Sequence, residues 1–221
     1  TCALPIYRPK TGAGVVTTCI PPESADLAYG AIREACEEGH QAYVVCPLID
    51  EKDDGSELDD VPEASRSAAT RIHSAEAAYE ELSRRTLRGL RVGLLTGRMG
   101  AAQKDEAMEA FRRGDVDVLV STTVIEVGVD VPNATVMLVY DADRFGLATL
   151  HQLRGRVGRG DWEGHVFLEC AAKKGTPART RLAALERTSD GFELAELDLK
   201  LRHEGEALGY RQHGGPSLKV V

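Results

Sequence analysis

A nearly continuous apolar run at residues 41–49 (QAYVVCPLI) is the strongest constraint on the fold of this chain. A strand that is apolar at consecutive positions is buried on both faces, which is typical of a parallel sheet covered by helices. Further strands are predicted at residues 13–20, 91–95, 116–121, 134–140 and 165–170, and helices at residues 25–38, 64–87, 101–113 and 147–157. Strands that alternate with helices predict right-handed crossovers and an α/β, doubly wound parallel sheet.

The C-terminal part of the chain has a different pattern from the rest. Residues 177–187 and 192–202 are predicted to form two helices of a hairpin, and a glycine-rich tail at residues 205–215 follows. Acidic residues 50–62 are predicted to form an exposed loop. We therefore expect a lead-in at residues 1–20, a sheet domain at residues 21–172, and a helical hairpin with its loop at residues 173–221.

Composition places the chain among globular proteins that need neither disulfide bonds nor a bound metal to stabilise their core. Its 221 residues are 43% hydrophobic, and no apolar run approaches the roughly 20 residues that span a bilayer. Neither a signal peptide nor an initiator Met is present at the N-terminus, so we expect an excised fragment. The five cysteines are scattered and form no CxxC pair, which argues against a disulfide framework or a zinc ribbon and favours a reducing cytoplasm.

The net charge of −8 argues against a protein that coats nucleic acid generally, because such proteins are usually basic. Seven of the 35 acidic residues, however, fall within residues 50–60, so the rest of the chain is nearly balanced. A narrow basic track on an acidic body remains compatible with this composition, because the local field decides contact.

Residues 121–132 are the first candidate site, because they follow a predicted strand directly. Ligands of open α/β sheets bind beyond the carboxyl ends of the strands. The hydroxyls of Ser121, Thr122 and Thr123 can donate to phosphate oxygens, Gly128 allows close backbone approach, and Asp130 can accept from a ribose hydroxyl. For the three hydroxyl residues alone, a capped helix start followed by a turn is an equally good interpretation.

Residues 152–160 and 96–99 are the second and third candidates, also placed beyond strand ends. Arg156 and Arg159 would share a helix face if the predicted helix continues, and two guanidinium groups suit a transferring phosphoryl group. Taken alone, this segment is more often a pair of surface arginines. Arg98 follows the strand at residues 91–95 and can contact a nucleic-acid backbone, although a solvated loop is an equal alternative.

Several phosphate-binding and catalytic motifs are absent from the sequence. It contains no GxxxxGK[ST] loop, no GxGxxG after the first strand, no HExxH, no GxSxG and no paired Cys/His metal set. Arginine donors without a phosphate cradle predict that this chain supplies half of a nucleotide site and that the other half lies elsewhere.

The motifs together resemble a known family. Residues 121–135 (STTVIEVGVDVPNAT) and 143–160 (DRFGLATLHQLRGRVGRG) are similar to motifs V and VI of superfamily-two helicases, and most similar to those of the RecG family. Residues 41–49 resemble motif IV, and TGRM at residues 96–99 with the following KDEAMEAF resembles the HGRM region. Residues 188–214 resemble the TRG motif, a helical hairpin and loop shared by the RecG family and the transcription-repair coupling factors.

The chain departs from the family pattern at three places. It has LRHEGE at residues 201–206 where the family usually has LRGPGE, and GYRQHG at residues 209–214 where the family usually has GTRQSG. The proline of the loop is thereby lost, but Arg202, Arg211 and Gln212 remain. The third departure is TGRM in place of HGRM.

The resemblance implies the second RecA-like motor domain of a P-loop NTPase, without a Walker A loop, followed by the TRG hairpin. ATP with Mg²⁺ would bind jointly with a first motor domain outside this chain. Arg156 and Arg159 would reach the phosphates, with Arg159 as the arginine finger. Gln152 would couple nucleotide to DNA, and Gly128 and Asp130 would lie on the nucleotide side.

For nucleic acid, the resemblance places Arg98, Thr122 and Thr123 near the DNA backbone. Arg202, Arg211 and Gln212 would transmit domain closure to a wedge domain. The implied activity is an ATP-dependent double-stranded DNA translocase or helicase that acts on stalled forks and Holliday junctions in recombination and repair.

The implied partners are branched DNA, the first motor domain and the wedge of the same parent chain, and a single-stranded DNA-binding protein. The implied location is the bacterial cytoplasm at the nucleoid, with no membrane contact. A translocase like the transcription-repair coupling factor and a non-catalytic nucleic-acid-binding module are the alternatives.

Overall fold

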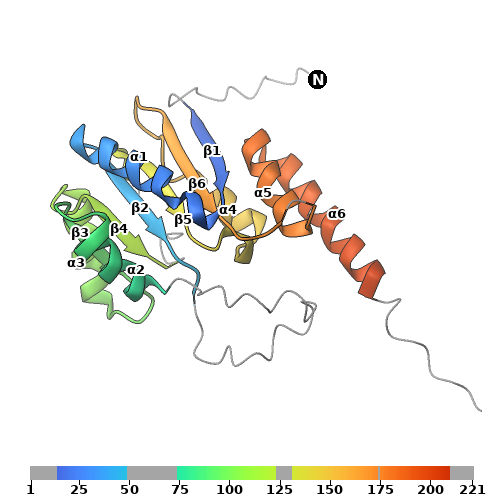
Figure 1. The fold of residues 1–221 in the computed structure, drawn as a ribbon, viewed down its shortest axis with the longest axis horizontal. Helices are drawn as coiled ribbons and strands as arrows, with labels where there is room; N and C mark the ends of the chain where they lie inside the picture. Colours follow the sequence, from blue (N-terminus) through green and yellow to red (C-terminus); the bar gives the residue numbers. More distant parts are fainter. Residues whose placement is uncertain (1–13, 49–73, 123–130, 174, 210–221) are drawn as a thin grey trace, which may run out of the picture.

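The computed structural model describes residues 14–48, 74–122, 131–173 and 175–209, except for the side chains of residues 201–209. Within these residues, six strands form one sheet in the order β1-β6-β5-β2-β4-β3, and all neighbouring strands are parallel (Figure 1). The strands are β1 (Val15–Ile20), β2 (Gln41–Val45), β3 (Val92–Leu95), β4 (Val118–Ser121), β5 (Ala134–Val139) and β6 (Gly164–Glu169). The predicted α/β, doubly wound parallel sheet is confirmed.

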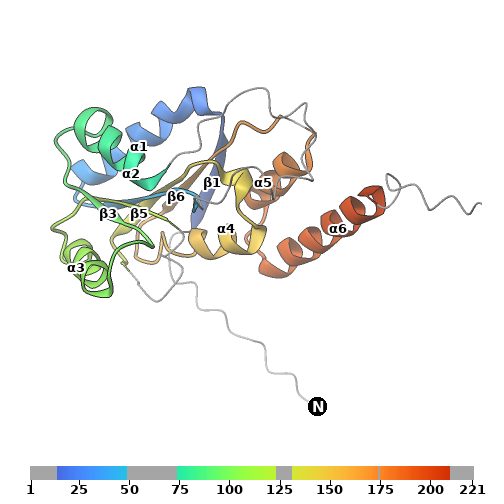
Figure 2. The same cartoon turned by 90° about the horizontal axis from the view of Figure 1, so that it is seen from below.

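Helices cover both faces of the sheet (Figure 2). α1 (Ala25–Glu37) and α2 (Ala75–Glu81) lie on one face, and α3 (Ala101–Arg112) and α4 (Leu147–Arg154) lie on the other. α5 (Pro177–Arg187) packs against β1, and α6 (Gly191–Gly209) packs against α4 and α5 and then extends away from the sheet. None of the described helices is long and apolar enough to cross a membrane.

Strand β2 shows why the central apolar run is needed. Ala42 and Val44 pack on the side of α1 and α2, whereas Tyr43 and Val45 pack on the side of α3 and α4. All four side chains are fully buried. The ring of Tyr43 meets that of Phe111 from α3 in a tilted contact, with 4.9 Å between centroids, so a core exists on both sides of the strand.

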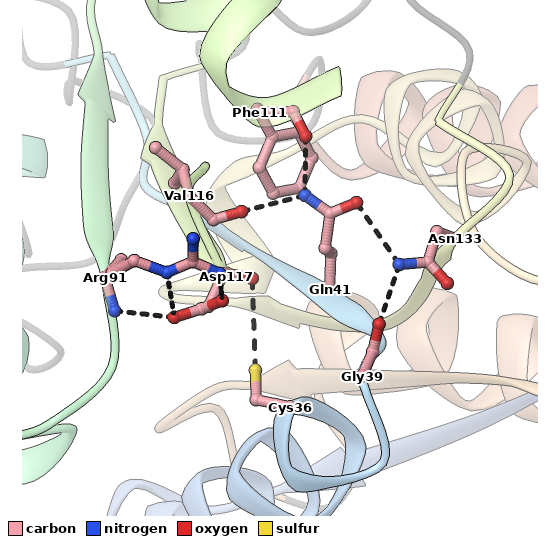
Figure 3. Close-up of polar contacts among 8 residues, drawn as sticks. All are labelled: Cys36, Gly39, Gln41, Arg91, Phe111, Val116, Asp117 and Asn133. Atoms are coloured by element: carbon pink, nitrogen blue, oxygen red, sulfur yellow. Dashed lines mark hydrogen bonds and ion pairs between the residues drawn. The ribbon is translucent and has the colours of Figure 1, made fainter. Parts of the chain in front are cut away.

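A polar network closes the amino end of the sheet (Figure 3). The side-chain amide of buried Gln41 donates to the backbone carbonyls of Phe111 (2.6 Å) and Val116 (2.8 Å), and Asn133 donates to the carbonyl of Gly39 (2.9 Å). These bonds supply donors to a carbonyl in the last turn of α3 and to carbonyls in the loops before β2 and β4. The network therefore ties the start of β2 to the loops before β4 and β5.

An ion pair between Arg91 and Asp117 borders this network. Burial alone would raise the pKa of Asp117, but hydrogen bonds from the side chain and backbone of Arg91 outweigh it, and the pKa is lowered. Asp117 therefore stays ionised. Its ion pair with Arg91 joins the turn before β4 to the residue that precedes β3.

Three predicted helices differ from the observed ones. α4 ends at Arg154 rather than residue 157, because the chain turns through Gly155 and then through Gly158, whose φ is +66°. α6 continues to Gly209 and so includes the first residues of the predicted glycine-rich tail. A glycine costs only about 1 kcal/mol inside a helix, and the Glu, Ala and Leu residues around Gly205 favour it. Of the helix predicted at residues 64–87, only the part from residue 74 is described, and it ends in a π-helical turn, Leu82–Thr86.

The predicted acidic loop at residues 50–62 lies outside the described residues. Strand β1 falls within the segment expected to be a lead-in, and it forms one edge of the sheet. The division into three parts otherwise stays a prediction.

We predict that Phe111→Ala lowers the free energy of unfolding by about 3–5 kcal/mol, because it leaves a cavity beside Tyr43 in a fully buried site. Phe192→Ala is the matched control, because Phe192 is 79% exposed and its truncation should change stability by no more than about 0.5 kcal/mol. Urea denaturation of the two variants measures both values. Equal losses would show that the α3 face of the sheet is not the tightly packed core described above.

Candidate functional site

The candidate residues lie at two opposite ends of the sheet rather than at one. The segment after β3 and the start of the segment after β4 lie at the carboxyl end, as predicted. The arginine segment lies at the amino end: the amide of Gly158 donates to the carbonyl of Ala134 at the start of β5 (3.4 Å), and Gly158 touches Gly164 at the start of β6. The prediction that placed this segment beyond the carboxyl ends is therefore wrong, because α4 runs back along the sheet before the arginines follow.

A pocket of about 300 Å³ opens at the carboxyl end. Residues after β2, β3 and β4 and at the start of α2 line it: Pro47, Leu48, Ser74, Ala75, Glu76, Thr96, Gly97, Arg98 and Thr122. The structure thus brings together Arg98 and Thr122, which the sequence predicted to contact the DNA backbone. Thr122 is buried, and its hydroxyl has no hydrogen-bond partner among the described residues, so a donor is available for an anionic ligand.

The loop that carries Arg98 is held in shape by its neighbours. Lys104 of α3 donates to the carbonyl of Gly97 (2.9 Å), and the amide of Thr96 donates to the Met99 sulfur (3.3 Å). The amide of Met99 donates back to the carbonyl of Thr96 (3.3 Å). Arg98 therefore projects as an exposed side chain from a loop whose backbone is already fixed.

The arginine segment follows α4 as a turn. Because the helix ends at Arg154, Arg156 and Arg159 do not share a helix face, and that conditional prediction fails. Arg156 is half-buried and Arg159 is exposed, with its Nε donating to the carbonyl of Gly155. A Cβ at Gly158 would lie 2.9 Å from Val15 and 3.0 Å from the backbone of Gly164, so only glycine fits this turn.

Arg154 is a buried residue beside the candidate site that the sequence analysis did not single out. Its side chain is buried, and its Nη1 donates to the carbonyls of Leu185 (3.0 Å) and Thr188 (2.8 Å) at the end of α5. These are among the carbonyls that a helix leaves without internal partners. The spacing from Leu147 through Leu150 to Arg154 places Arg154 on the buried face of α4, and this spacing was the available signal.

His151 completes this contact. Its Nδ1 accepts a hydrogen bond from Nη2 of Arg154 (2.9 Å), so its ring is neutral and carries its proton on Nε2. The pKa of His151 is lowered. Burial is the larger cause, and the positive charge of Arg154 is the second. A Cβ on Gly191 would lie 3.2 Å from the ring, so α6 begins in direct contact with α4.

A groove of about 430 Å³ runs between α4 and α6. It is lined by Leu147, Ala148, His151, Gln152, Gly191, Leu194, Ala195, Asp198 and Leu199. Gln152, the predicted coupling residue between nucleotide and DNA, thus lies beside the helical hairpin and is exposed. The hairpin therefore rests directly on the helix that leads into the arginine segment.

Several predicted site residues lie outside the described part of the chain. These are Thr123, Gly128, Asp130, Arg211 and Gln212, together with the side chain of Arg202. Their roles stay predictions.

Burial disfavours the thiolate form of the described cysteines. Burial raises the pKa of Cys19 to about 12 and that of Cys36 to about 11, and it also raises the pKa of Cys46 and Cys170. None of these four forms a disulfide, and the described residues contain no group of three or more His, Cys, Asp or Glu side chains that could hold a metal ion.

Known proteins similar to this chain are helicases. The helicase conserved C-terminal domain family matches residues 29–161. ATP-dependent DNA helicase RecG of Mycobacterium bovis is 51% identical over 211 residues, which are 96% of this chain and 28% of that protein. RecG of Staphylococcus aureus is 44% identical over 214 residues, 96% of this chain and 29% of that protein. The chain thus spans less than a third of the length of these relatives.

Solved structures give the same fold. A structure of RecG bound to a three-way DNA junction is 39% identical, with a TM-score of 0.69 over 97% of this chain and 25% of that one. Dbp5 of S. cerevisiae bound to RNA and ADP BeF3 is 16% identical, with a TM-score of 0.51 over 86% of this chain and 44% of that one. The second likeness shows the fold alone.

We predict that stability falls as the pH drops below about 6.5, partly through His151. The pKa of His151 is lower in the folded state, so the unfolded chain binds more protons in that window and protonation favours unfolding. His151→Asn keeps an acceptor at the position of Nδ1 and cannot be protonated, so its stability should depend less on pH. Urea midpoints between about pH 7.5 and pH 5 measure this. Identical profiles for both proteins would contradict it.

Proposed function

The chain belongs to the helicase conserved C-terminal domain family and its relatives are RecG helicases, and we propose that it is the second motor domain of an ATP-dependent DNA translocase. Its substrate is branched double-stranded DNA at stalled forks and Holliday junctions, in recombination and repair. The observation that carries the proposal is that two regions with potential phosphate donors, Arg156 with Arg159 and Arg98 with Thr122, lie at opposite ends of one sheet. One region serves nucleotide and the other serves DNA.

On the nucleotide side, Arg156 and Arg159 meet the phosphates of ATP, which is held with Mg²⁺ by a first motor domain. Arg159 is the more exposed of the two and acts as the arginine finger. By their resemblance to helicase motif V, Gly128 and Asp130 belong to the same side. The lack of a phosphate cradle in the sequence supports this division of the site between two domains.

On the DNA side, Arg98, Thr122 and Thr123 contact backbone phosphates. A guanidinium on a fixed loop and a buried hydroxyl in one pocket are donors suited to phosphate oxygens. This local arrangement supports nucleic-acid binding in spite of the net charge of −8.

The two sides are coupled through α4 and the hairpin. Arg154 joins α4 to the end of α5, and Gln152 lies beside α6, so a displacement of the arginine segment moves the hairpin with it. Arg202, Arg211 and Gln212 pass this displacement to the wedge domain. ATP that bridges two motor domains favours the closed arrangement, and hydrolysis removes the bridge.

The first motor domain and the wedge of the parent chain are the intramolecular partners in this proposal, and a single-stranded DNA-binding protein is a further one. The protein works in the bacterial cytoplasm at the nucleoid. The high identity to RecG helicases supports this assignment over a translocase like the transcription-repair coupling factor.

In a full-length helicase carrying this domain, we predict that Arg159→Ala lowers kcat for ATP by about 10³- to 10⁵-fold while ATP binding changes little, because the guanidinium acts on the transition-state charge. Arg84 is 75% exposed and lies on the π-helical turn after α2, which packs on the other face of the sheet from α4, so Arg84→Ala should hydrolyse ATP normally. Steady-state hydrolysis with forked DNA and equilibrium binding of ATP measure the two effects. Near-normal turnover in Arg159→Ala would refute the finger role.

The same full-length protein tests the DNA side. We predict that Arg98→Ala weakens DNA binding about equally for all sequences and lowers the slope of log affinity against log salt by about 1, because one phosphate contact is lost. Arg112→Ala removes an arginine that pairs with Glu109 on α3 and should leave the slope unchanged. Fluorescence anisotropy with forked DNA at several salt concentrations gives both slopes. If the two variants gave the same slope, the pocket would not be the DNA contact.

A further inference from the structure

Trp162, the only tryptophan of the chain, is exposed on the loop between the arginine segment and β6. Its side chain is 59% exposed, which is unusual for a residue that carries so much apolar surface. The loop begins only three residues earlier with Arg159. An exposed aromatic ring beside the proposed phosphate contacts is suited to stack on a planar group of the same ligand.

The ring is held in a fixed position by the polar network at the amino end of the sheet. Its centroid lies 4.9 Å from that of His40, and the two rings are inclined by 58°. His40 is hydrogen-bonded through Nδ1 to Oδ1 of Asn133 (3.0 Å), and Asn133 donates to the carbonyl of Gly39 (2.9 Å; Figure 3). Trp162 therefore contacts His40 on one side, while more than half of its side chain stays open to solvent.

The rest of the loop is also fixed. A Cβ at Gly160 would lie 3.1 Å from the carbonyl of Pro132, and Gly158 and Gly164 are packed against each other. Three residues of extended chain span at most about 10 Å, so Arg159 and Trp162 lie within reach of one small ligand. Phosphate groups at Arg159 and a second group at Trp162 can thus belong to the same nucleotide.

Charge decides which end of a nucleotide meets the ring. Asp161 and Glu163 flank Trp162 and are both exposed, so a phosphate beside the ring would be repelled. Arg156 and Arg159 attract phosphates farther back along the loop. An uncharged base has a π-face that stacks on an aromatic side chain whatever its sequence identity.

We propose that Trp162, supported by His40, is the stacking platform for the base of the nucleotide whose phosphates meet Arg156 and Arg159. This inference rests on the proposed function, because it concerns the same nucleotide. It assigns Trp162 a role in nucleotide affinity and leaves the chemical step to the arginines.

The test uses a full-length helicase that carries this domain, with tripolyphosphate as a probe that has phosphates and no base. Trp162→Ala should raise KM for ATP by about 5- to 150-fold, the range that base–aromatic stacking covers, with kcat unchanged. Inhibition by tripolyphosphate should be the same in Trp162→Ala and in the parent. Trp162→Phe should restore most of the affinity for ATP, whereas Trp162→Leu, which keeps an apolar contact with His40, should not.

Two outcomes would overturn the proposal. An unchanged KM in Trp162→Ala would show that the ring does not meet the base and leave it as a surface for another partner. Equal weakening of ATP and tripolyphosphate would show that the substitution displaces the arginines. The proposed function is tested separately, by Arg159→Ala. If Arg159→Ala lost turnover while KM in Trp162→Ala stayed unchanged, only the stacking role of Trp162 would be contradicted.

Discussion

The buried guanidinium of Arg154 is the interaction on which the arrangement of the C-terminal half depends. Taking a charge out of water is costly unless it is hydrogen-bonded, and Arg154 makes three such bonds, to two carbonyls of the α5 end and to the ring of His151. Removing any one partner would leave a buried polar group unsatisfied. The contact between α4 and the hairpin is therefore close to all-or-none, which is the property that a mechanical link requires.

A rigid sheet makes this link useful. The central strands β2 and β5 are buried at every position, so the close-packed core between the carboxyl and amino ends resists deformation. α4 begins near the first region and ends at the second. In the proposed motor, a change at the nucleotide thus moves the whole domain, with its DNA contacts, as one body.

The sequence allowed the fold to be predicted because the strands carry their own signal. Two-sided burial of β2 and β5 needs consecutive apolar residues, and such runs are typical of a parallel sheet. The site was harder to predict, because the position of a segment after a helix depends on where that helix ends. Gly155 and Gly158 terminate α4 early, and the arginines fall at the amino end as a result.

Arg154 and Trp162 show two further limits of prediction from sequence. The sequence alone does not show which of three arginines within six residues is buried. The packing of α5 distinguishes the buried Arg154 from Arg156 and Arg159. The exposed ring of Trp162 contacts that of His40, 122 residues away in sequence. Such a contact depends on how the loops before β2 and β6 meet at one end of the sheet. That meeting is fixed by the strand order, in which β5 alone separates β2 from β6, and local patterns do not encode it.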